Sequence, residues 1–558
     1  MAEDKLEFDY IIVGAGSAGC VLANRLSEDP AARVLLLEAG GRDSYVWIHM
    51  PLAMRPVSRR PQLNWGYDTE PEPNCHGRRI PIPRGRVLGG TSSINAMIYA
   101  RGHPQDYDQW RQMGLGGWGY DDLLPLFKRS ERSWRGETEF HGGVGPLRTS
   151  PQKVQSPIYD MFAAAGEKLG FPKIDDYNGA NSEGIARPDF TIGDGRRAST
   201  ARSFLRPAMD RANLTIETHA QASRVIIKRG RAIGIEFRQN GQVRTTSASR
   251  EVILSGGTYN SPHLLMLSGI GPAAALREHG IQTIVDRPAV GQNLQDHVNT
   301  FVTFNCGKPV SFDSEMRFDR MTRAVFRWLT VKTGRAASLP IQCVGFLRTR
   351  PESERPDIEL LVSPVGPDAH LWFPGVRRPL GHRYSSRIAV LHPKSRGRVT
   401  LRSADPADKP LILWNLFDDP TDLETLREGV KAVRRIIATE PLASVIADEV
   451  RPGPGVDTDA KIDEFLRRHC ETAHHPAGTC RMGSDDDAVV DAGLRVRGID
   501  GLRVADCSIM PDVVGSNTNA PTIMIAEKAS DMIKASASGT PMNRDAGGSR
   551  TRVNDDET

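Results

Sequence analysis

The first forty residues carry the clearest pattern of apolar and polar positions in the chain. Residues 10–13 form a short apolar run rich in β-branched side chains, as a buried parallel strand does. Residues 20–26 place apolar side chains at helical spacing, and residues 33–37 form a second apolar run that ends at Glu38. This order predicts a strand, a helix and a second parallel strand, with an acidic side chain where the second strand ends.

The loop between the first strand and the helix predicts what this unit binds. It reads GAGSAG, which gives Gly14, Gly16 and Gly19 the spacing GxGxxG around Ser17. Gly14 permits a tight turn, Gly16 lets the backbone approach a pyrophosphate, and Gly19 lets the helix pack closely on the strand. Glu38 follows nineteen residues after Gly19, where a carboxylate can accept hydrogen bonds from a ribose diol. The pattern predicts a dinucleotide site, and by itself it does not distinguish FAD from NAD.

A second glycine-rich stretch, GRVLGGTSSINAMIYARG at residues 85–102, follows a proline-rich excursion. Gly89 and Gly90 allow close approach of the backbone to a ligand. Thr91 and Asn95 offer hydroxyl and amide groups beside them. The alternative is a capped helix N-terminus that binds no ligand.

Strands return after a loop-rich segment, at residues 214–217, 224–228, 232–237 and 252–254. Asn240-Gly241 predicts a hairpin turn between two of these strands. A helix is predicted to start at Ser261-Pro262 and to end at Gly269.

Residues 299–451 have a different character, with most of the later tryptophans, strands at 387–391 and 399–401, and an amphipathic helix at 421–439. We expect a substrate domain here, although the same aromatic residues would suit an ordinary second core. A last helix is predicted at residues 522–532. From Ala535 onward the chain has no apolar pattern, and we expect a disordered tail.

Composition narrows the function classes. With 558 residues, 39% hydrophobic and 25% charged, the chain fits a globular protein of two or three domains. The net charge of +4 comes without a concentrated Lys/Arg run, so nucleic acid is not an expected partner. The seven cysteines form no CxxC, so we expect no metal site and a reducing, cytoplasmic location. No secretory signal or membrane-spanning run occurs, which leaves peripheral contact with the inner membrane open.

Four stretches together resemble the glucose–methanol–choline (GMC) oxidoreductases, a family of FAD enzymes. They are the N-terminal GxGxxG unit, GRVLGGTSSIN from Gly85, GTYNSPHLLMLSGIG at residues 257–271, and the pair HPAGT and NTNAPT near the C-terminus. The resemblance covers residues 8–533 and is greatest to bacterial choline-dehydrogenase-like members. It implies an α/β fold, in which a Rossmann-like FAD-binding domain carries a smaller α+β substrate domain of sheet and helices.

The resemblance also implies how these domains alternate along the chain. We expect the FAD-binding domain at residues 1–150, 213–298 and 452–534, the substrate domain at 151–212 and 299–451, and the tail at 535–558. In some members a histidine in the first signature links covalently to the flavin. Ile94 stands at that position here, so we expect non-covalent FAD.

By the same resemblance the stretch around Thr91 to Met97 lines the flavin, the Val225 backbone meets the adenine, and Ala505 and Asp506 lie near the pyrophosphate and ribityl chain. The cofactor-binding residues expected on this basis are Gly14, Gly16, Ser17, Gly19, Glu38, Gly90, Thr91, Asn95, Ala96, Met97, Val225, Ala505, Asp506 and Thr518.

The catalytic residues implied by the resemblance are His475 and Asn517. Imidazole titrates near neutrality and suits a group that takes the hydroxyl proton of an alcohol while hydride passes to flavin N5. Asn517 can hydrogen-bond the oxygen without titrating, and Asn519 is the alternative by a two-residue shift. We expect His474 to form a pocket wall and His297 to be structural.

The substrate is the least determined part. Choline-specific members carry a glutamate where Gln342 stands, so we expect a neutral primary alcohol, aliphatic or aromatic, with choline as the alternative. A dehydrogenase is favoured over an oxidase, and the electron acceptor (a quinone, an artificial acceptor or oxygen) and the oligomeric state stay open. Two further classes are a hydroxynitrile lyase of the same fold and a flavin-binding protein without catalysis.

Overall fold

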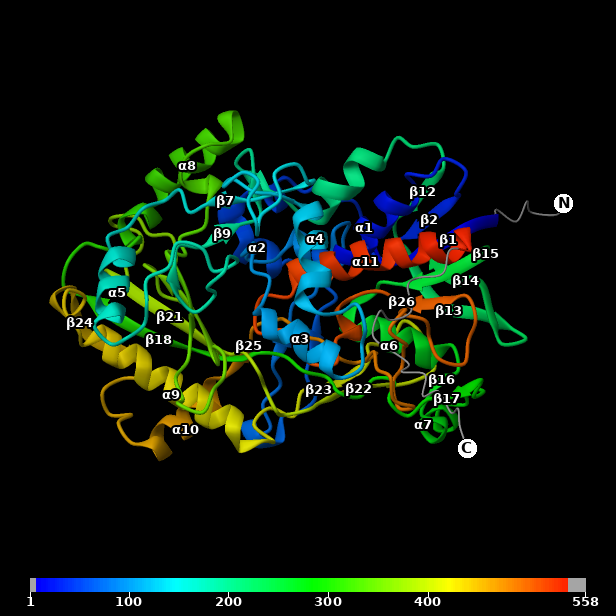
Figure 1. The fold of residues 1–558 in the computed structure, drawn as a ribbon. Coiled ribbons are helices and arrows are strands. Elements are labelled where there is room, and N and C mark those ends of the chain that lie inside the picture. The colour runs from blue at the N-terminus through cyan, green and yellow to red at the C-terminus, as the bar shows by residue number, and fades with distance from the viewer. Residues whose placement is uncertain (1–6, 540–558) are drawn as a thin grey trace, which may run out of the picture.

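Two seven-stranded sheets organise the chain, one at each end of the view in Figure 1. The structure is a computed structural model that describes residues 7–539. Within that range, no helix is both long and apolar enough to cross a lipid bilayer.

The first sheet contains the predicted βαβ unit. Its strands β1 (Glu7–Val13), β2 (Val34–Leu37) and β12 (Leu214–Glu217) are parallel, and α1 (Ser17–Leu26) connects the first two. The apolar runs are buried along β2 and most of β1, as expected for strands covered on both faces. The α11 helix (Asn519–Ser538) packs against α1, so the C-terminal segment returns to the N-terminal unit (Figure 1).

The sheet continues into an antiparallel part, in the order β12-β2-β1-β15-β14-β13, where β13 is Ala220–Lys228 and β26 (Leu502–Val504) also pairs with β15. The predicted turn is confirmed: Asn240 and Gly241 have φ of 51° and 78° and join β14 (Arg231–Gln239) to β15 (Gln242–Leu254). The prediction of a strand at 252–254 was too short. The earlier part of β15 is polar and largely exposed, yet its backbone pairs with β14, so an apolar run could not reveal it.

The second sheet has the order β24-β18-β21-β20-β19-β8, and β25 also pairs with β18. Its strands are β8 (Gly184–Ala186), β18 (Val298–Cys306), β19 (Cys343–Leu347), β20 (Ile358–Ser363), β21 (Arg383–Val390), β24 (Ile446–Arg451) and β25 (Glu471–Thr472). Helix α9 (Pro420–Ile437), at the predicted place, packs on β18, β20 and β21. The strand expected at 387–391 begins four residues earlier. The division into two domains stays a prediction.

Two helix boundaries differ from the predictions. Helix α6 (Gly257–Leu267) begins before Ser261, with Pro262 inside it. The Thr258 carbonyl, which Pro262 cannot satisfy, accepts a hydrogen bond from Thr479 Oγ1 at 2.6 Å instead. Helix α11 continues to Ser538, past the expected start of the tail at Ala535. The rest of the expected tail, residues 540–558, lies outside the described residues.

The smaller elements fill the space around the two sheets. Further α-helices are α2 (Met54–Ser58), α3 (Pro104–Gln112), α4 (Tyr120–Ser130), α5 (Ile158–Glu167), α7 (Ala273–Glu278), α8 (Phe318–Val331) and α10 (Asp459–His469). Two-stranded pairs are β3 (Tyr67–Asp68) with β4 (Pro81–Ile82), β5 (Glu131–Arg132) with β6 (Leu147–Arg148), β7 (Ser150–Pro151) with β9 (Asp189–Phe190), β10 (Ile192–Gly193) with β11 (Arg196–Arg197), β16 (Ile270–Gly271) with β17 (Val285–Asp286), and β22 (Arg398–Thr400) with β23 (Leu411–Leu413).

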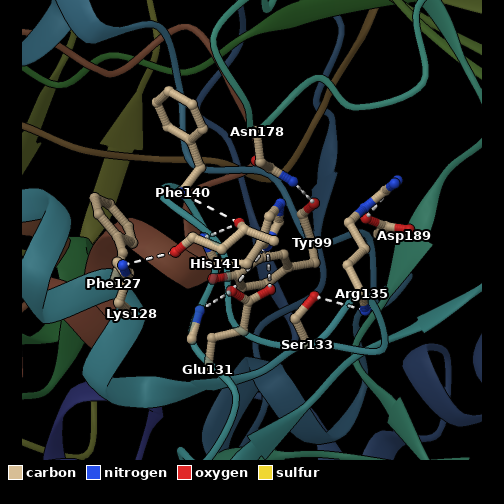
Figure 2. A network of polar contacts seen from close by, with 12 residues as sticks. Tyr99, Phe127, Lys128, Glu131, Ser133, Arg135, Phe140, His141, Asn178 and Asp189 are labelled. Atoms are coloured by element: carbon tan, nitrogen blue, oxygen red, sulfur yellow. Dashed lines mark hydrogen bonds and ion pairs between the residues drawn. The ribbon is translucent and has the colours of Figure 1, made fainter.

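A buried ionic network holds the segment that follows the second glycine-rich stretch. Arg101 Nη2 lies 2.7 Å from Glu131 Oε2, and His141 Nδ1 lies 3.0 Å from the same carboxylate. Nε2 of His141 lies 2.8 Å from Asp176 Oδ2. Figure 2 shows His141 beside Glu131, close to Tyr99. Because every charge here has a partner of opposite sign, the network can be buried and can fix the loop around His141 to the body of the protein.

Candidate active site

A cavity of about 940 Å³ is lined by residues of both sheets. Its lining includes the carboxyl ends of β1 and β2, with Gly14 and Glu38. It also includes Arg387 of β21, His475 and Asn517. A cavity at the carboxyl ends of parallel strands is where open α/β sheets bind dinucleotides.

The N-terminal glycine loop has the shape that a dinucleotide requires. Gly14 has φ of 100°, and a Cβ there would lie 2.6 Å from the Ser255 carbonyl oxygen. A Cβ on Gly19 would lie 1.9 Å from the Gly14 carbonyl oxygen, so Gly19 serves helix–strand packing and does not line the cavity. Gly16 and Ser17 do line it. The loop therefore leaves its backbone open to a ligand.

Glu38 is held at the end of β2 by two backbone hydrogen bonds. Its Oε2 accepts from the Ala15 N–H at 3.0 Å, and its Oε1 accepts from the Gly40 N–H at 2.8 Å. Burial raises the pKa of Glu38 to about 7, although these bonds act in the opposite direction. The carboxylate is thus fixed in place beside the cavity, where a ribose can reach it.

The second glycine-rich stretch lies directly against the first. Gly90 has φ of 52°, and a Cβ there would lie 2.7 Å from Gly16 Cα. Gly90 is also the first residue of a short 3-10 helix, Gly90–Ser93. The cavity is lined by Gly90, Thr91, Asn95, Ala96 and Met97. The two loops together form a wall that only glycine permits at their contact.

The remaining expected cofactor residues divide into two groups. Asp506 and Thr518 line the cavity, and Asp506 Oδ2 accepts hydrogen bonds from the Gly257 N–H at 2.8 Å and from Ser261 Oγ at 2.6 Å. The structure does not bring Val225 or Ala505 to the cavity. The Val225 N–H donates to Ser268 Oγ, and the Ala505 N–H donates to the Leu254 carbonyl. The earlier residues of β13, Ala220 to Ala222, form the wall where Val225 was expected.

His475 and Asn517 meet inside the cavity. Asn517 Nδ2 lies 3.0 Å from His475 Nε2. Asn519 points elsewhere, and its Oδ1 accepts a hydrogen bond from Ser17 Oγ at 2.8 Å. The geometry therefore places Asn517, and not Asn519, beside the histidine.

The other ring nitrogen of His475 contacts His297, a residue that the sequence marked only as structural. The two Nδ1 atoms are 3.0 Å apart. As placed, the Asn517 amide donates to Nε2 of His475, so the neutral ring carries its proton on Nδ1 and donates it to His297 Nδ1. The backbone N–H of His475 also donates to Asp296 Oδ1 at 2.8 Å. These contacts fix both the orientation and the tautomer of His475.

Electrostatics keep His475 uncharged. Burial, together with His297 and the positive charge of Arg387, lowers the pKa of His475 well below its ordinary value. Burial also lowers the pKa of His297 and of His474 to about 3. A neutral imidazole with an unprotonated Nε2 can accept a proton at neutral pH.

Two parts of the cavity were not identified from the sequence. One is a strand face that carries Phe301, Leu361 and Arg387. The other is Arg84, whose guanidinium donates to the His474 carbonyl at 2.6 Å. His474 itself lines the cavity, as expected for a pocket wall. No local motif marks Arg387, because the pairing of distant strands brings it to the site.

A glycine-loop dinucleotide cradle that shares one cavity with a neutral histidine and an asparagine defines a dinucleotide-dependent oxidoreductase. Comparison with known proteins gives the family. The N-terminal and C-terminal family models for GMC oxidoreductase match residues 8–299 and 393–526. The chain belongs to the GMC oxidoreductase family and is an FAD-dependent oxidoreductase that acts on CH–OH groups.

Named relatives are similar to this chain over almost its full length. An oxygen-dependent choline dehydrogenase of Sinorhizobium fredii is 45% identical over 530 residues, which are 95% of this chain and 96% of that protein. The crystal structure of pyridoxine 4-oxidase from Mesorbium loti has a TM-score of 0.84 at 33% identity, covering 94% of this chain and 98% of that one. Formate oxidase of Aspergillus oryzae has a TM-score of 0.89 at 30% identity, covering 96% and 100%. The fold expected from the sequence is confirmed.

The residues of the cradle fit FAD. The glycine contacts leave open backbone where a pyrophosphate would lie, Glu38 stands at the ribose position, and the second stretch leads on to His475. Ile94 stands at the position of the histidine that binds the flavin covalently in some members, and it lines this cavity. Non-covalent binding of FAD stays a prediction.

Proposed function

We propose that the chain oxidises a primary alcohol to an aldehyde, with His475 as the proton acceptor and Asn517 as the group that orients the alcohol oxygen. The contact between these two side chains inside the FAD cavity is the observation that carries the proposal. Bound FAD supplies the acceptor for the hydride that leaves the carbon. The protein supplies position and proton transfer.

The protein's own groups have separate tasks in this proposal. Nε2 of His475 takes the hydroxyl proton, since its lone pair is available at neutral pH. The Asn517 amide donates to the oxygen as negative charge develops there. His297 holds the His475 ring by the contact between their Nδ1 atoms. His297 is therefore a positioning residue.

Choline is the substrate that the names of the relatives favour over a neutral alcohol. The other relatives are named for pyridoxine and formate, so substrate charge varies within the family. The structure does not support the expectation of a neutral alcohol, which was based on Gln342. Gln342 is fully buried, its Nε2 donates to the Val154 carbonyl at 2.8 Å, and it does not line the cavity.

The first test is anaerobic mixing of the yellow protein with a panel of alcohols that includes choline, with the absorbance of oxidised flavin as the signal. Bleaching by an alcohol supports the proposal and identifies the substrate class. Release of cyanide from a hydroxynitrile, without bleaching, would indicate a lyase. Bound FAD that responds to neither would indicate a flavin-binding protein without this catalysis. Repeating the reaction with oxygen or a quinone then distinguishes oxidase from dehydrogenase.

We also propose that the protein attaches to the surface of the inner membrane from the cytoplasm, through helix α8 and the neighbouring loop at residues 371–378. Phe326 of α8 is 68% exposed, and Val376 of the loop is 83% exposed. The Phe318 N–H donates to the Trp372 carbonyl at 2.9 Å, so helix and loop form one surface. In Figure 1, α8 lies at the edge of the molecule.

Charge points to an anionic lipid surface as the partner of this patch. Exposed arginines lie beside the apolar residues at positions 320, 323, 327, 377 and 378. Two copies of the chain joined through this face by a twofold axis would bring these arginines together. Anionic headgroups would instead pair with the arginines, while the apolar side chains of Phe326 and Val376 enter the lipid interface.

A further inference from the structure

One face of the second sheet forms the substrate end of the cavity. Across the adjacent strands, Arg387 of β21 is paired with Phe301 of β18 on one side and with Leu361 of β20 on the other. Residues directly opposite each other in a sheet project from the same face. All three line the cavity that also contains His475 and Asn517, so an arginine lies between two apolar side chains in the same cavity as the catalytic pair.

The Arg387 guanidinium has unused hydrogen-bonding capacity. Its Nε and Nη2 atoms are buried without a hydrogen-bond partner, and the ion pairs found within residues 7–539 do not include it. Its positive charge contributes to the lowered pKa values of His297, His474 and His475, which places it near the reacting end. A buried donor pair without an acceptor is costly unless a ligand supplies one.

Two carboxylates could balance this charge from within the protein. Glu359 lies on the same strand face, two residues before Leu361, but it does not line the cavity and no ion pair with Arg387 is found within the described range. Burial raises the pKa of Glu359, although the positive charge of Arg387 acts in the opposite direction. Glu471 is exposed at the cavity wall, near Arg55 and Arg451. The positive charges of these two arginines already balance its negative charge. The Nε and Nη2 donors of Arg387 therefore have no carboxylate partner among the residues that the structure describes.

We infer that the substrate is an alcohol that also carries a carboxylate, which pairs with Arg387 while its hydroxyl reaches His475 and Asn517. The planar guanidinium matches a carboxylate with two parallel hydrogen bonds. Phe301 and Leu361 flank the apolar part of such a molecule. Choline would instead bring a quaternary ammonium toward the positive charge of Arg387, and the two charges repel each other. This inference rests on the proposed alcohol oxidation and specifies its substrate.

A matched set of alcohols tests it: 4-(hydroxymethyl)benzoate, its methyl ester and choline, each mixed anaerobically with the FAD-loaded protein. We expect the carboxylate to bleach the flavin with a kcat/KM roughly tenfold to a hundredfold above that of the ester, the range for a hydrogen-bonded ion pair. Choline should be the poorest of the three. Bleaching by the ester or choline, at rates equal to or above the carboxylate, overturns the inference and leaves the proposed function intact. Absence of bleaching by every alcohol in a broad panel overturns both.

Variants locate the effect at Arg387. R387M should lose the preference for the carboxylate over the ester, and R387K should keep part of the preference. Binding of 4-methylbenzoate, which cannot be oxidised, gives a second readout through the flavin absorbance. Its Kd should rise at least about tenfold in R387M. An unchanged Kd in an R387M protein that retains FAD would contradict the assignment.

Discussion

His297 and His475 face each other through their Nδ1 atoms, 3.0 Å apart, with the ring planes at 80°. Only one of the two atoms can carry the proton, and the bond from Asn517 to Nε2 assigns it to His475. The catalytic ring is therefore held from both sides in the tautomer that leaves Nε2 unprotonated.

Removing the acceptor should impair this arrangement without removing the base. We expect His297→Leu to slow anaerobic flavin reduction about tenfold to a hundredfold, because His475 then loses its fixed tautomer. His297→Gln retains an acceptor oxygen and should recover part of the rate. If both variants lose the same thermal stability and reduce the flavin as fast as the wild type, His297 has the purely structural role first expected from the sequence.

The pKa of His475 predicts how flavin reduction depends on pH. Burial and the neighbouring positive charges hold this pKa well below 6.5, so the base is already deprotonated at pH 6. The rate of anaerobic reduction should stay flat as pH rises from 6 and fall only under more acidic conditions. A fall with a midpoint near 6.5 would show that the imidazole titrates as it does in water.

The contact of the two glycine-rich stretches predicts a variant that loses FAD. Gly90→Ala would place a Cβ 2.7 Å from Gly16 Cα at a residue with φ of 52°. The ratio of flavin to protein after purification should fall by about half or more, because the cradle must move to relieve the clash. Gly455→Ala is the control, since nothing lies within 4 Å of its Cβ, and it should retain full FAD content.

His141 predicts a loss of stability at alkaline pH. Burial alone would lower the pKa of His141, but hydrogen bonds to Asp176 and Glu131 outweigh burial and raise it to about 9. A raised pKa means that this stabilisation is complete below pH 6.5 and is lost as pH rises toward 9. The free energy of unfolding should fall by about 2 kcal/mol over this interval through His141 alone.

Denaturation of His141→Gln over the same pH range measures that contribution. The variant should be less stable at pH 6.5 and should differ less from the wild type at pH 9. A constant difference at the two pH values would show that the charge of His141 does not contribute.

The proposed membrane surface is tested with vesicles. The protein should sediment with vesicles that contain anionic lipid, and Phe326→Ser with Val376→Ser should reduce the bound fraction at least about fivefold. High salt should release the protein from the membrane, since arginines contribute to binding. Equal binding by the wild type and the double variant would show that this patch does not bind membranes. Dimerisation of the wild type but not of the variant would show that the patch serves self-association.

The cofactor half of the site could be predicted from the sequence because its signals are local. Gly14, Gly16 and Glu38 lie within one βαβ unit, where each position has a geometric requirement that few residue types meet. His475 and Asn517 required the family resemblance, since nothing local distinguishes a catalytic histidine from a buried one. Val225 does not line the cavity, because the first residues of β13, Ala220 to Ala222, do so, and nothing local in the sequence marks which part of that strand reaches the cavity.

The substrate half depends on pairing between strands far apart in the sequence. Arg387 meets Phe301 across 86 positions of chain, and the sheet register alone decides that they share a face. His297 reaches His475 in the same way, from a loop before β18. The Pro262 boundary failed for a related reason: Thr479, distant in sequence, satisfies the carbonyl that proline leaves free.

The most direct test of the central claim is the rate of anaerobic flavin bleaching by the best alcohol of the panel, in the wild type and in His475→Gln at equal FAD content. The variant should keep the spectrum of bound oxidised FAD and bleach at least about a hundredfold more slowly, because general base catalysis is lost. A His475→Gln protein that bleaches as fast as the wild type would contradict the role of His475 as the proton acceptor.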